Sequence, residues 1–380
     1  MPHSLKVAIL SPYDFAYHGG VNSHVTNLHY HLADKGVKAT IIAPFSGDID
    51  TAPRSLIPFG KSIPVKIAGS VARISFSLKT YFQIQNFLKN HFFDVIHVHE
   101  PFGGSITLGA ISPKMRDGSL KVATFHSFEG SSMHRFIPNK VLRNFSNNLD
   151  GKIAVSDSAK KYASKYFQSD YKIIPNGIDL SDQLVEDLYP NIDDTKINIL
   201  FVGRFEKRKG LFFLIQAYLN LKQKYDNIRL LIAGGGELDS ESQKILSSRY
   251  PIDIMFLGQV TELQKQSLFK KSDIFCAPST GQESFGIVLL ESMRSGTCLV
   301  ASNIEGYKNV VQHMRECLLS EPKDVLSLQN NIEILINNEK LRIQLGLNAL
   351  KSVQKYDWDL VSNDILDYYR QLILKKENFN

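Results

Sequence analysis

The chain has 380 residues, of which 43% are hydrophobic and 22% charged, so it can bury the cores of two domains and is not intrinsically disordered. Its net charge of +6 is modest, and no apolar run approaches the roughly 20 residues that span a bilayer. The cysteines, Cys276, Cys298 and Cys317, lack C-x-x-C spacing, so we expect buried thiols rather than disulfides or metal ligands.

Predicted strands and helices alternate through the first half of the chain. The opening residues, MPHSLKVAIL, enter a strand at once and show no signal-peptide core, so we expect a cytoplasmic protein. Apolar residues then recur at helical spacing over residues 18–36, and Gly36 ends that helix. Strands are predicted at residues 6–12, 37–44, 95–101, 121–127, 151–157 and 172–177.

The alternation restarts in the second half, after the turn-forming tripeptide Pro175-Asn176-Gly177. Strands are predicted at residues 198–205, 228–236, 254–260, 273–279 and 297–303. Serial strand–helix units of this kind predict an α/β protein with two parallel-sheet, Rossmann-like domains.

Glycine-rich turns follow several predicted strands, where a backbone can approach a phosphate at the start of the next helix. His18-Gly19-Gly20 and Gly234-Gly235-Gly236 have this context, although each is also compatible with a plain tight turn. Because no G-x-G-x-x-G follows the first strand, a dinucleotide-dependent dehydrogenase is disfavoured.

The stretch GRFEKRKG, residues 203–210, leaves a strand and opens a helix with four cations. A solvated charged turn is one interpretation. The alternative is that Arg204 and Lys209 clamp a diphosphate and stabilise the charge that develops on it as it departs.

Glu283 and Glu291 lie eight residues apart in GQESFGIVLLESM. Eight helical residues at a rise of about 1.5 Å place the two about 12 Å apart, beyond the roughly 5–9.5 Å of a glycoside hydrolase pair. The spacing suits one carboxylate at the sugar and the other at the ribose of a nucleotide-sugar, with the helix start between them at the diphosphate. A surface helix with acidic ends is the alternative.

Histidines mark two neighbouring predicted strands. His126 ends one, and His97 and His99 alternate on the other, so that both point to one face. None of these has the sequence spacing of metal ligands, and the D-x-D matches at 48–50 and 357–359 lie in a loop and near the C-terminus, so no metal is implied.

Positive charge is concentrated in the first half. Residues 1–175 hold 20 Lys and Arg against 11 Asp and Glu, whereas residues 176–380 hold 24 against 27. Basic residues alternate with aromatic ones between Lys61 and Lys89, a pattern compatible with an anionic membrane surface, with nucleic acid or with a solvated face.

Taken together, these stretches resemble the family 4 retaining glycosyltransferases of GT-B architecture over nearly the whole chain. The most specific motifs are GRFEKRKG, FLGQV, SDIFCAP and ESFGIVLLE, the last fitting the family's E-x7-E signature. SPYDF, GGVNSHV, GSVAR, DVIHVHEP, VATFHS and IAVSD resemble the branch of the family that mannosylates phosphatidyl-myo-inositol, and YDWDLVSNDILDYYRQL is similar to the family's terminal helix, which crosses back to the first domain.

The resemblance implies an N-terminal, lipid-side acceptor domain, residues 1–176 with a crossover helix at 356–380, and a nucleotide-sugar domain, residues 177–355. It also implies a catalytic set, a donor site and no metal or other cofactor. The catalytic set comprises His126, Arg204, Lys209 and Glu283. The donor site comprises Tyr13, Gly20, Arg204, Arg208, Lys209, Val260, Glu262, Lys265, Glu283, Phe285, Gly286, Ile287 and Glu291.

Within that donor site, Glu262 would accept from the N1–H and N2–H of guanine, a donor pair that uracil lacks, which favours GDP-mannose over a UDP-sugar. On the acceptor side, Asn22 and Arg73 would contact the lipid headgroup, Arg73 at its phosphate. Asn22 replaces the family's Gln, and Ile67 and Ala68 replace a Tyr-Asn pair that helps to hold inositol.

The expected function is therefore retaining transfer of mannose from GDP-mannose to a phosphatidylinositol-type glycolipid at the cytoplasmic membrane face, with no nucleic-acid partner. Alternatives within the class are another nucleotide-hexose donor, a diacylglycerol lipid acceptor or a soluble sugar acceptor. An NAD(P)-dependent oxidoreductase and a non-catalytic sugar-nucleotide sensor are the alternatives outside it.

Overall fold

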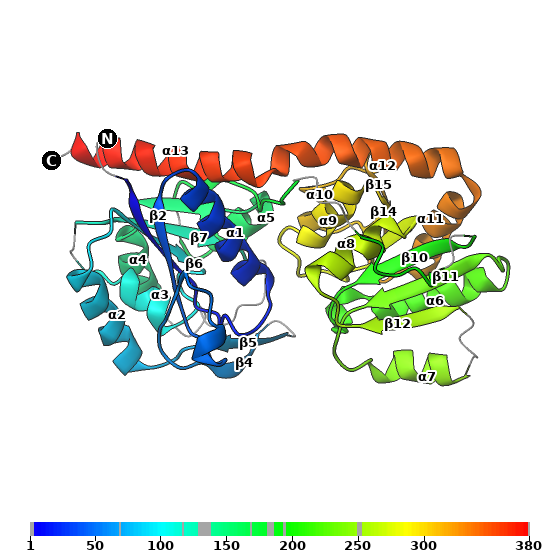
Figure 1. Ribbon diagram of the computed structural model, residues 1–380, viewed down its shortest axis with the longest axis horizontal. Coiled ribbons are helices and arrows are strands. Elements are labelled where there is room, and N and C mark those ends of the chain that lie inside the picture. Colours follow the sequence, from blue (N-terminus) through cyan, green and yellow to red (C-terminus); the bar gives the residue numbers. More distant parts are fainter. Residues whose placement is uncertain are drawn as a thin grey trace. The chain divides into compact units, whose positions relative to one another are not determined.

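The computed structural model describes residues 4–67, 70–115, 118–127, 138–167, 169–180, 186–192, 195–248 and 253–378. The chain divides into two compact units (Figure 1). Unit 1 comprises Met1–Gly177 and Trp358–Asn380, and unit 2 comprises Ile178–Asp357.

Unit 1 is built on a seven-stranded parallel sheet, within the described residues, in the order β3-β2-β1-β6-β7-β8-β9. Its strands are β1 (Lys6–Leu10), β2 (Lys38–Ala43), β3 (Leu56–Pro58), β6 (Val95–His99), β7 (Leu120–Phe125), β8 (Gly151–Ala154) and β9 (Lys172–Ile173). A separate antiparallel hairpin joins β4 (Ile63–Ile67) to β5 (Ser70–Ile74).

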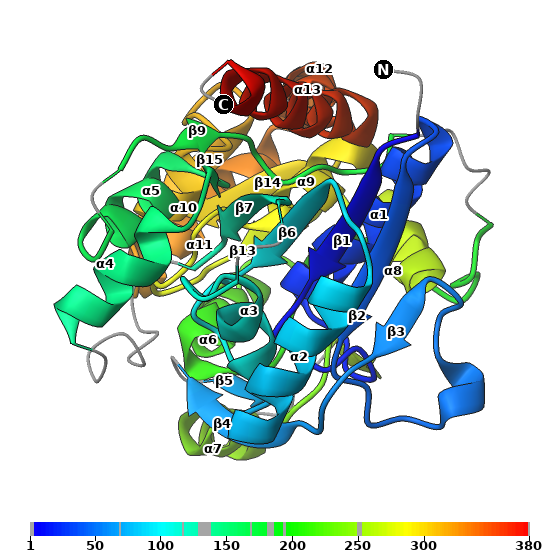
Figure 2. The same cartoon turned by 90° about the vertical axis from the view of Figure 1, so that its left-hand side faces the viewer.

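Helices cover both faces of this sheet, as Figure 2 shows. On one face, α1 buries Val25, Leu28 and Leu32, and α13 buries Trp358 and Tyr369, in a common core with β1, β2 and β7. This burial follows the 3.6-residue apolar period of α1. The helices of unit 1 are α1 (Gly20–Asp34), α2 (Leu78–Asn90), α3 (Ser105–Ala110), α4 (Asn139–Asn147), α5 (Asp157–Ser164) and α13 (Trp358–Glu377), with a 3₁₀ turn, η1, at Ile49–Thr51.

The described part of unit 2 repeats this plan with a six-stranded parallel sheet in the order β12-β11-β10-β13-β14-β15. Its strands are β10 (Ile197–Val202), β11 (Ile228–Ala233), β12 (Ile254–Gly258), β13 (Ile274–Ala277), β14 (Cys298–Ser302) and β15 (Cys317–Ser320). Its helices are α6 (Leu211–Lys222), α7 (Ser240–Ser248), α8 (Glu262–Lys270), α9 (Ile287–Ser295), α10 (Glu305–Lys308), α11 (Val325–Asn337) and α12 (Glu339–Val353), with 3₁₀ turns η3 (Lys207–Lys209) and η4 (Gln354–Tyr356).

The core of unit 2 joins Leu214 and Tyr218 of α6, and Ile332 of α11, to the apolar residues of β10 and β11. The three cysteines are free and buried, which confirms the expectation from their spacing. No helix among the described residues has the length and apolar character needed to cross a membrane.

All eleven predicted strands are confirmed, and most end a few residues before the predicted ends. Strands β3, β4, β5 and β15 were not predicted. One geometric expectation is wrong: α9 begins only at Ile287, so the rise of a continuous helix does not set the distance between Glu283 and Glu291. Gly286 stands before the first turn with φ at 86°, a left-handed conformation that ends any helix extending back to Glu283.

Both sheets reverse their strand order beside their first strand. In unit 1 the chain builds β2 and β3 on one side of β1 and then continues with β6 on the other side. In unit 2 the reversal falls between β10 and β13. Open α/β sheets bind ligands outside the carboxyl ends of the strands at such a switch point, so the loops after β1, β6, β10 and β13 are the places to look for a site.

Candidate functional site

The loops after β10 and β13 meet in one group of charged side chains in unit 2. Glu283, in the loop after β13, accepts through one oxygen, Oε1, from Arg208 Nη1 and from Lys209 Nζ, each at 2.6 Å. All three side chains are largely buried. The structure thus brings predicted catalytic and donor-binding residues to the switch point of the sheet.

A second carboxylate, Glu206, extends this group. Its Oε2 accepts from Arg208 Nε at 2.8 Å, and its Oε1 lies 3.0 Å from Arg204 Nη1. Arg208 therefore bridges two carboxylates, whereas the Arg204 side chain is 56% exposed. Glu206 was not predicted as a site residue, because a carboxylate beside several cations in sequence looks like an ordinary charged turn.

Close contacts between backbones hold the loop after β10 against the loop after β13. The amide of Thr280 donates to the carbonyl of Arg208 at 2.8 Å. Gly210, which follows Lys209 and precedes α6, has φ at 73°, and a Cβ there would lie 1.9 Å from the carbonyl oxygen of Pro278. Only glycine fits this position, so the placement of Lys209 depends on it.

The start of α9 offers backbone rather than side chains. Phe285 is buried and packs edge-on against Tyr356 with ring centroids 5.7 Å apart. A Cβ at Gly286 would lie 2.5 Å from the Tyr307 ring. Of the predicted donor residues Phe285, Gly286 and Ile287, the first two can therefore contribute only main-chain groups, as expected for anion binding at a helix start.

A second charged group in unit 2 joins α8 to α9. Lys265 Nζ lies 2.6 Å from Glu291 Oε1 and 2.8 Å from Glu262 Oε2. Burial alone would lower the pKa of Lys265, but the two carboxylates outweigh it and raise that pKa, so the lysine stays charged. Val260 precedes the Thr261 cap of α8, and Glu262, its first residue, is 61% exposed. The predicted base and ribose residues thus form one connected set.

In unit 1, Tyr13 and Gly20 belong to the connection between β1 and α1. Tyr13 pairs with Ile74 in an isolated β-bridge, and burial, together with the charge of Glu100, raises the pKa of its hydroxyl. Gly20 is the first residue of α1, after the extended Gly19. Its amide is therefore among the unpaired donors that a helix start presents.

Asn22 and Arg73 are both tied to this connection. Asn22 donates to the carbonyls of Asp14 at 2.9 Å and Tyr17 at 3.1 Å, and accepts from Ser11 Oγ at 3.1 Å, so its amide holds the loop. The guanidinium of Arg73 lies over the Tyr17 ring, 4.5 Å from its centroid. Contact of either residue with an acceptor stays a prediction, and Ala68 and residues 128–136 after the FHS motif lie outside the described residues.

His126 directly follows β7 and is buried among other histidines. Its Nε2 lies 2.9 Å from Nδ1 of His99, the last residue of β6, and its backbone N–H donates to Glu100 Oε1 at 2.7 Å. His24 of α1 packs against both rings. Burial lowers the pKa of His24 to about 4 and that of His126 well below its usual range, so both are neutral near pH 7. Sequence spacing could not reveal this group, because its members come from three elements.

The predicted site residues therefore fall into two sets. Tyr13, Gly20, Asn22, Arg73 and His126 belong to unit 1, and the remaining predicted residues belong to unit 2. Two doubly wound parallel sheets in separate units, with a terminal helix that returns to the first unit, define a protein of GT-B architecture.

The comparisons with known proteins identify the family. Residues 18–182 match the family model described as Glycosyltransferase Family 4, and residues 189–352 match the one described as Glycosyl transferases group 1. The chain is 33% identical over 371 residues to a phosphatidyl-myo-inositol mannosyltransferase of Mycobacterium leprae, covering 96% of each chain. It is 32% identical over 373 residues to the protein of that name in Mycobacterium tuberculosis, again covering 96% of each. The chain belongs to the family 4 glycosyltransferases.

Solved structures share the fold. A sucrose-phosphate synthase from Thermosynechococcus elongatus superposes with a TM-score of 0.77 at 20% identity, covering 98% of this chain and 100% of that one. HepE from Anabaena, solved in complex with UDP-glucose, superposes with a TM-score of 0.72 at 18% identity, covering 97% and 100%. At these identities the likeness supports the GT-B architecture.

Proposed function

We propose that this glycosyltransferase moves mannose from GDP-mannose to a phosphatidylinositol-type lipid, with retention, at the cytoplasmic face of a membrane. One observation carries the proposal: the chain aligns over 96% of its length with relatives named phosphatidyl-myo-inositol mannosyltransferase, at 32–33% identity. The charged groups of unit 2 support the donor half of the proposal, and the basic surface of unit 1 supports the acceptor half.

The donor diphosphate would be held by Arg208 and Lys209. Both cations converge on one oxygen of Glu283, so their charged ends already lie close together. A diphosphate brings more negative charge than this single carboxylate and would displace it from the cations. Glu283 would then be free to accept hydrogen bonds from hexose hydroxyls, while Arg204, which is more exposed, would close on the phosphate from solvent.

The nucleoside would be read by the set that joins α8 to α9. Glu291 would accept from the ribose hydroxyls, and Glu262 would accept from the two N–H groups of a guanine edge. Lys265 holds both carboxylates in place through its ion pairs. This arrangement favours guanine over uracil, because uracil has no such pair of adjacent donors.

In the reaction, the acceptor hydroxyl oxygen would bond to the anomeric carbon of mannose on the face from which GDP departs. The bond from that carbon to the phosphate oxygen breaks, and the leaving phosphate takes the hydroxyl proton. Arg208 and Lys209 would stabilise the negative charge that develops on the leaving group. His126, neutral near pH 7, would accept a hydrogen bond from the transferred sugar.

The lipid would approach the surface formed by α2. Leu78 and Phe82 are 78% and 60% exposed on this helix, with the exposed Lys79 and Lys89 on the same element. Apolar side chains beside lysines are the combination that binds an anionic membrane surface. Arg73 would pair with the lipid phosphate.

A different acceptor is the second candidate, because Ile67 and Ala68 stand where the resembled branch has Tyr and Asn. A lipid without inositol, or a soluble sugar, would need no such contacts. The donor half of the proposal is the same for both candidates.

A product assay separates these possibilities. Purified enzyme is incubated with GDP-mannose, UDP-glucose or ADP-glucose, each with phosphatidylinositol vesicles, diacylglycerol vesicles or soluble inositol phosphate, and products are identified by mass spectrometry. We expect a mannosylated lipid from GDP-mannose and phosphatidylinositol alone. Preference for a UDP- or ADP-sugar would overturn the donor, and product from another acceptor would favour the second candidate.

Thermal unfolding in the presence of GDP and NAD⁺ provides the control for an inactive preparation. Ligand at about 100 times its Kd stabilises the folded state by about 2.7 kcal/mol. Stabilisation by GDP without any transfer would indicate a sensor, and stabilisation by NAD⁺ instead would indicate an oxidoreductase.

A further inference from the structure

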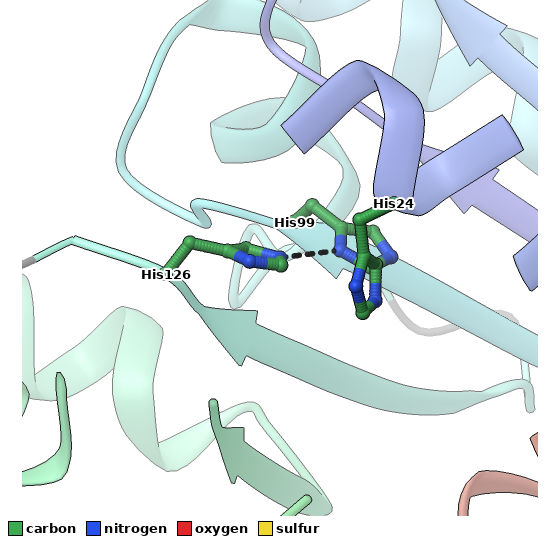
Figure 3. A group of neighbouring side chains, drawn as sticks. All are labelled: His24, His99 and His126. Carbon is green, nitrogen blue, oxygen red and sulfur yellow. Dashed lines mark hydrogen bonds between the residues drawn. The ribbon is translucent and has the colours of Figure 1, made fainter. Parts of the chain in front are cut away.

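Three buried histidines of unit 1 converge on one point (Figure 3). His24 comes from α1, His99 ends β6, and His126 follows the neighbouring strand β7. One ring nitrogen from each can be chosen so that the three atoms lie within 4.8 Å of one another. The group lies at the carboxyl edge of the sheet, beside the reversal of strand order between β1 and β6.

Several polar atoms here lack hydrogen-bond partners. Both ring nitrogens of His24 and Nε2 of His99 are buried without one, and so is Nε1 of Trp358, whose ring packs 4.9 Å from that of His24. Asn176 lies near His24 and His126 but makes no hydrogen bond of good geometry with either ring. Because buried polar groups are normally paired, this concentration of unpaired nitrogens indicates that a further group belongs among them.

The ring positions match those of a three-histidine metal centre. In a tetrahedral site each imidazole nitrogen lies about 2.0–2.1 Å from zinc, and the ring centre lies about 1.1 Å beyond the nitrogen. At the tetrahedral angle, the centres of two such rings are therefore about 5 Å apart. The centroids here are 5.2 Å apart for His24 and His99, 4.8 Å for His24 and His126, and 5.2 Å for His99 and His126. The spacing of the three ring centres therefore fits one shared ion.

We propose that His24, His99 and His126 form a binding site for a divalent transition metal of the Zn²⁺ class. Three imidazole nitrogens without a carboxylate suit zinc, cobalt or copper, whereas magnesium and calcium require oxygen ligands. Three protein ligands leave a fourth position open to water.

Binding of the metal has a consequence for His126. The ion takes the nitrogen that now faces His99 at 2.9 Å, so the hydrogen bond between the two rings is lost. His126 is then fixed on the metal and is no longer available to the sugar. Zinc therefore inhibits the enzyme, an effect that rests on the proposed function, whereas the binding itself does not.

Cobalt binding to the untagged full-length chain tests the site, because a histidine tag would itself bind cobalt. We expect one Co²⁺ per chain, intense visible absorption of a four-coordinate ion, and its loss when one equivalent of Zn²⁺ is added. His24→Gln and His99→Gln should each weaken binding at least tenfold. His91→Gln, which alters an exposed histidine of α2's C-terminal end, should leave binding unchanged.

The wild-type spectrum decides the question even where a buried variant fails to fold, which circular dichroism would reveal. Weak octahedral bands, absence of stoichiometric binding, or equal loss of binding in His91→Gln would overturn the site. Zinc inhibition of mannosyl transfer is measured separately, with GDP binding as a control. Cobalt binding that leaves transferase activity unchanged would overturn the inhibitory role. A complete lack of transferase activity would count against the proposed function, and the spectra would still decide whether the metal site exists.

Discussion

Glu283 is the residue on which the proposed donor chemistry depends. It holds Arg208 and Lys209 through a single oxygen and is largely buried with them. A buried charge without a partner is strongly destabilising, so in the free enzyme the carboxylate and the cations stabilise one another. When a diphosphate replaces Glu283 on the cations, the carboxylate needs new donors, and sugar hydroxyls can supply them. In the proposed site, recognition of the phosphate and recognition of the sugar would therefore be coupled.

Replacing Lys209 with Ala is expected to lower kcat by about 10²–10³-fold, or about 2.7–4 kcal/mol of transition-state stabilisation, as for loss of one charge-stabilising donor. The cation meets the departing phosphate, so the effect should fall on kcat more than on KM. Steady-state kinetics with GDP-mannose measure this.

Lys207→Ala is the matched control, since Lys207 is exposed on the same turn. Its kcat should stay within about twofold of wild type, because surface substitutions change energies by only about 0.5 kcal/mol. Equal losses in both variants would mean that overall charge, rather than the Lys209 position, is responsible.

Single residues were predictable where one stretch of sequence carried the signal. Arg204 and Lys209 follow an apolar strand and precede a helix, and that order alone placed them at a carboxyl edge, whereas Arg208 was expected only from the family resemblance. The pairing of His24 with His99 gave no such signal, because 74 residues lie between them in the sequence and only strand pairing and the packing of α1 bring them together.

At the scale of elements, Gly210 joins the 3₁₀ turn η3 to α6, and its replacement by Ala tests how that junction places Lys209. The added Cβ would lie 1.9 Å from Pro278 O, so the loops after β10 and β13 must separate. We expect the unfolding free energy to fall by more than about 2 kcal/mol, which exceeds the roughly 1 kcal/mol expected from left-handed backbone strain alone. We also expect kcat to fall.

Gly258→Ala separates strain from the clash. Gly258 has φ at 68° but nothing lies within 4 Å of its added Cβ, so only the strain of about 1 kcal/mol applies. Denaturant unfolding of both variants gives the comparison. If the two lose the same stability, the close approach to Pro278 does not hold the loops.

Asp14 holds the connection between β1 and α1 and makes it sensitive to pH. Its buried carboxylate accepts from Ala16 N at 3.0 Å, Ser46 N at 3.1 Å and Ser62 Oγ. Burial alone would raise the pKa of Asp14, but these hydrogen bonds outweigh it and hold that pKa below 3.8.

Because the folded-state pKa of Asp14 is depressed, its stabilisation is complete well above pH 3.8 and is lost as the pH falls below that value toward the folded-state pKa. Asp14→Asn should therefore destabilise the chain by about 1–3 kcal/mol at pH 7, and the difference from wild type should shrink under acid. Urea unfolding at several pH values measures both.

Asp48→Asn provides the control. Asp48 is exposed and caps the turn η1 through a single bond from Asp50 N at 3.2 Å, a role that Asn fills equally well. Its unfolding free energy should follow that of wild type at every pH. If the difference in unfolding free energy between Asp14→Asn and wild type stays constant as the pH falls, the charge of Asp14 is not what stabilises this connection.

Apolar runs made most strands predictable, including the two-residue β9, but β3, β15 and the β4–β5 hairpin were not predicted. The hairpin lies in a region whose most evident feature is alternation of basic and aromatic residues. The helix start was expected at Phe285-Gly286-Ile287, and α9 begins at Ile287. The distance argument failed because it counted the residues before the left-handed Gly286 as helical.

At the scale of the whole molecule, the last helix is part of the first unit. Tyr369 of α13 shares a 2.6 Å hydrogen bond with His97 Nδ1 in the core of unit 1, and Lys35 pairs with Asp359 at 2.8 Å. Trp358 packs so closely on Gly177 that a Cβ there would lie 2.5 Å from its ring. Both this helix and its place in unit 1 were expected only from the family resemblance.

Membrane binding is the property that the whole first unit is expected to provide. It carries most of the excess positive charge, and α2 exposes Leu78 and Phe82 one turn apart while its inner face buries Ile84 and Leu88. The double variant Leu78→Ser/Phe82→Ser should bind vesicles of anionic lipid at least about tenfold more weakly, because burial of each side chain contributes about 1.5–3 kcal/mol. Co-sedimentation with vesicles measures this.

The double variant Ile343→Ser/Leu347→Ser in α12 is the matched control. Its two positions are also four residues apart on a helix, and their side chains are 55% and 48% exposed. It should bind vesicles like wild type, and GDP affinity should be unchanged in both double variants. Wild-type binding should also weaken as salt rises, because lysines act on anionic lipid within a Debye length of about 10 Å at 0.1 M ionic strength. If both double variants lose vesicle binding equally, or if binding does not depend on lipid charge, the membrane-binding surface is not α2.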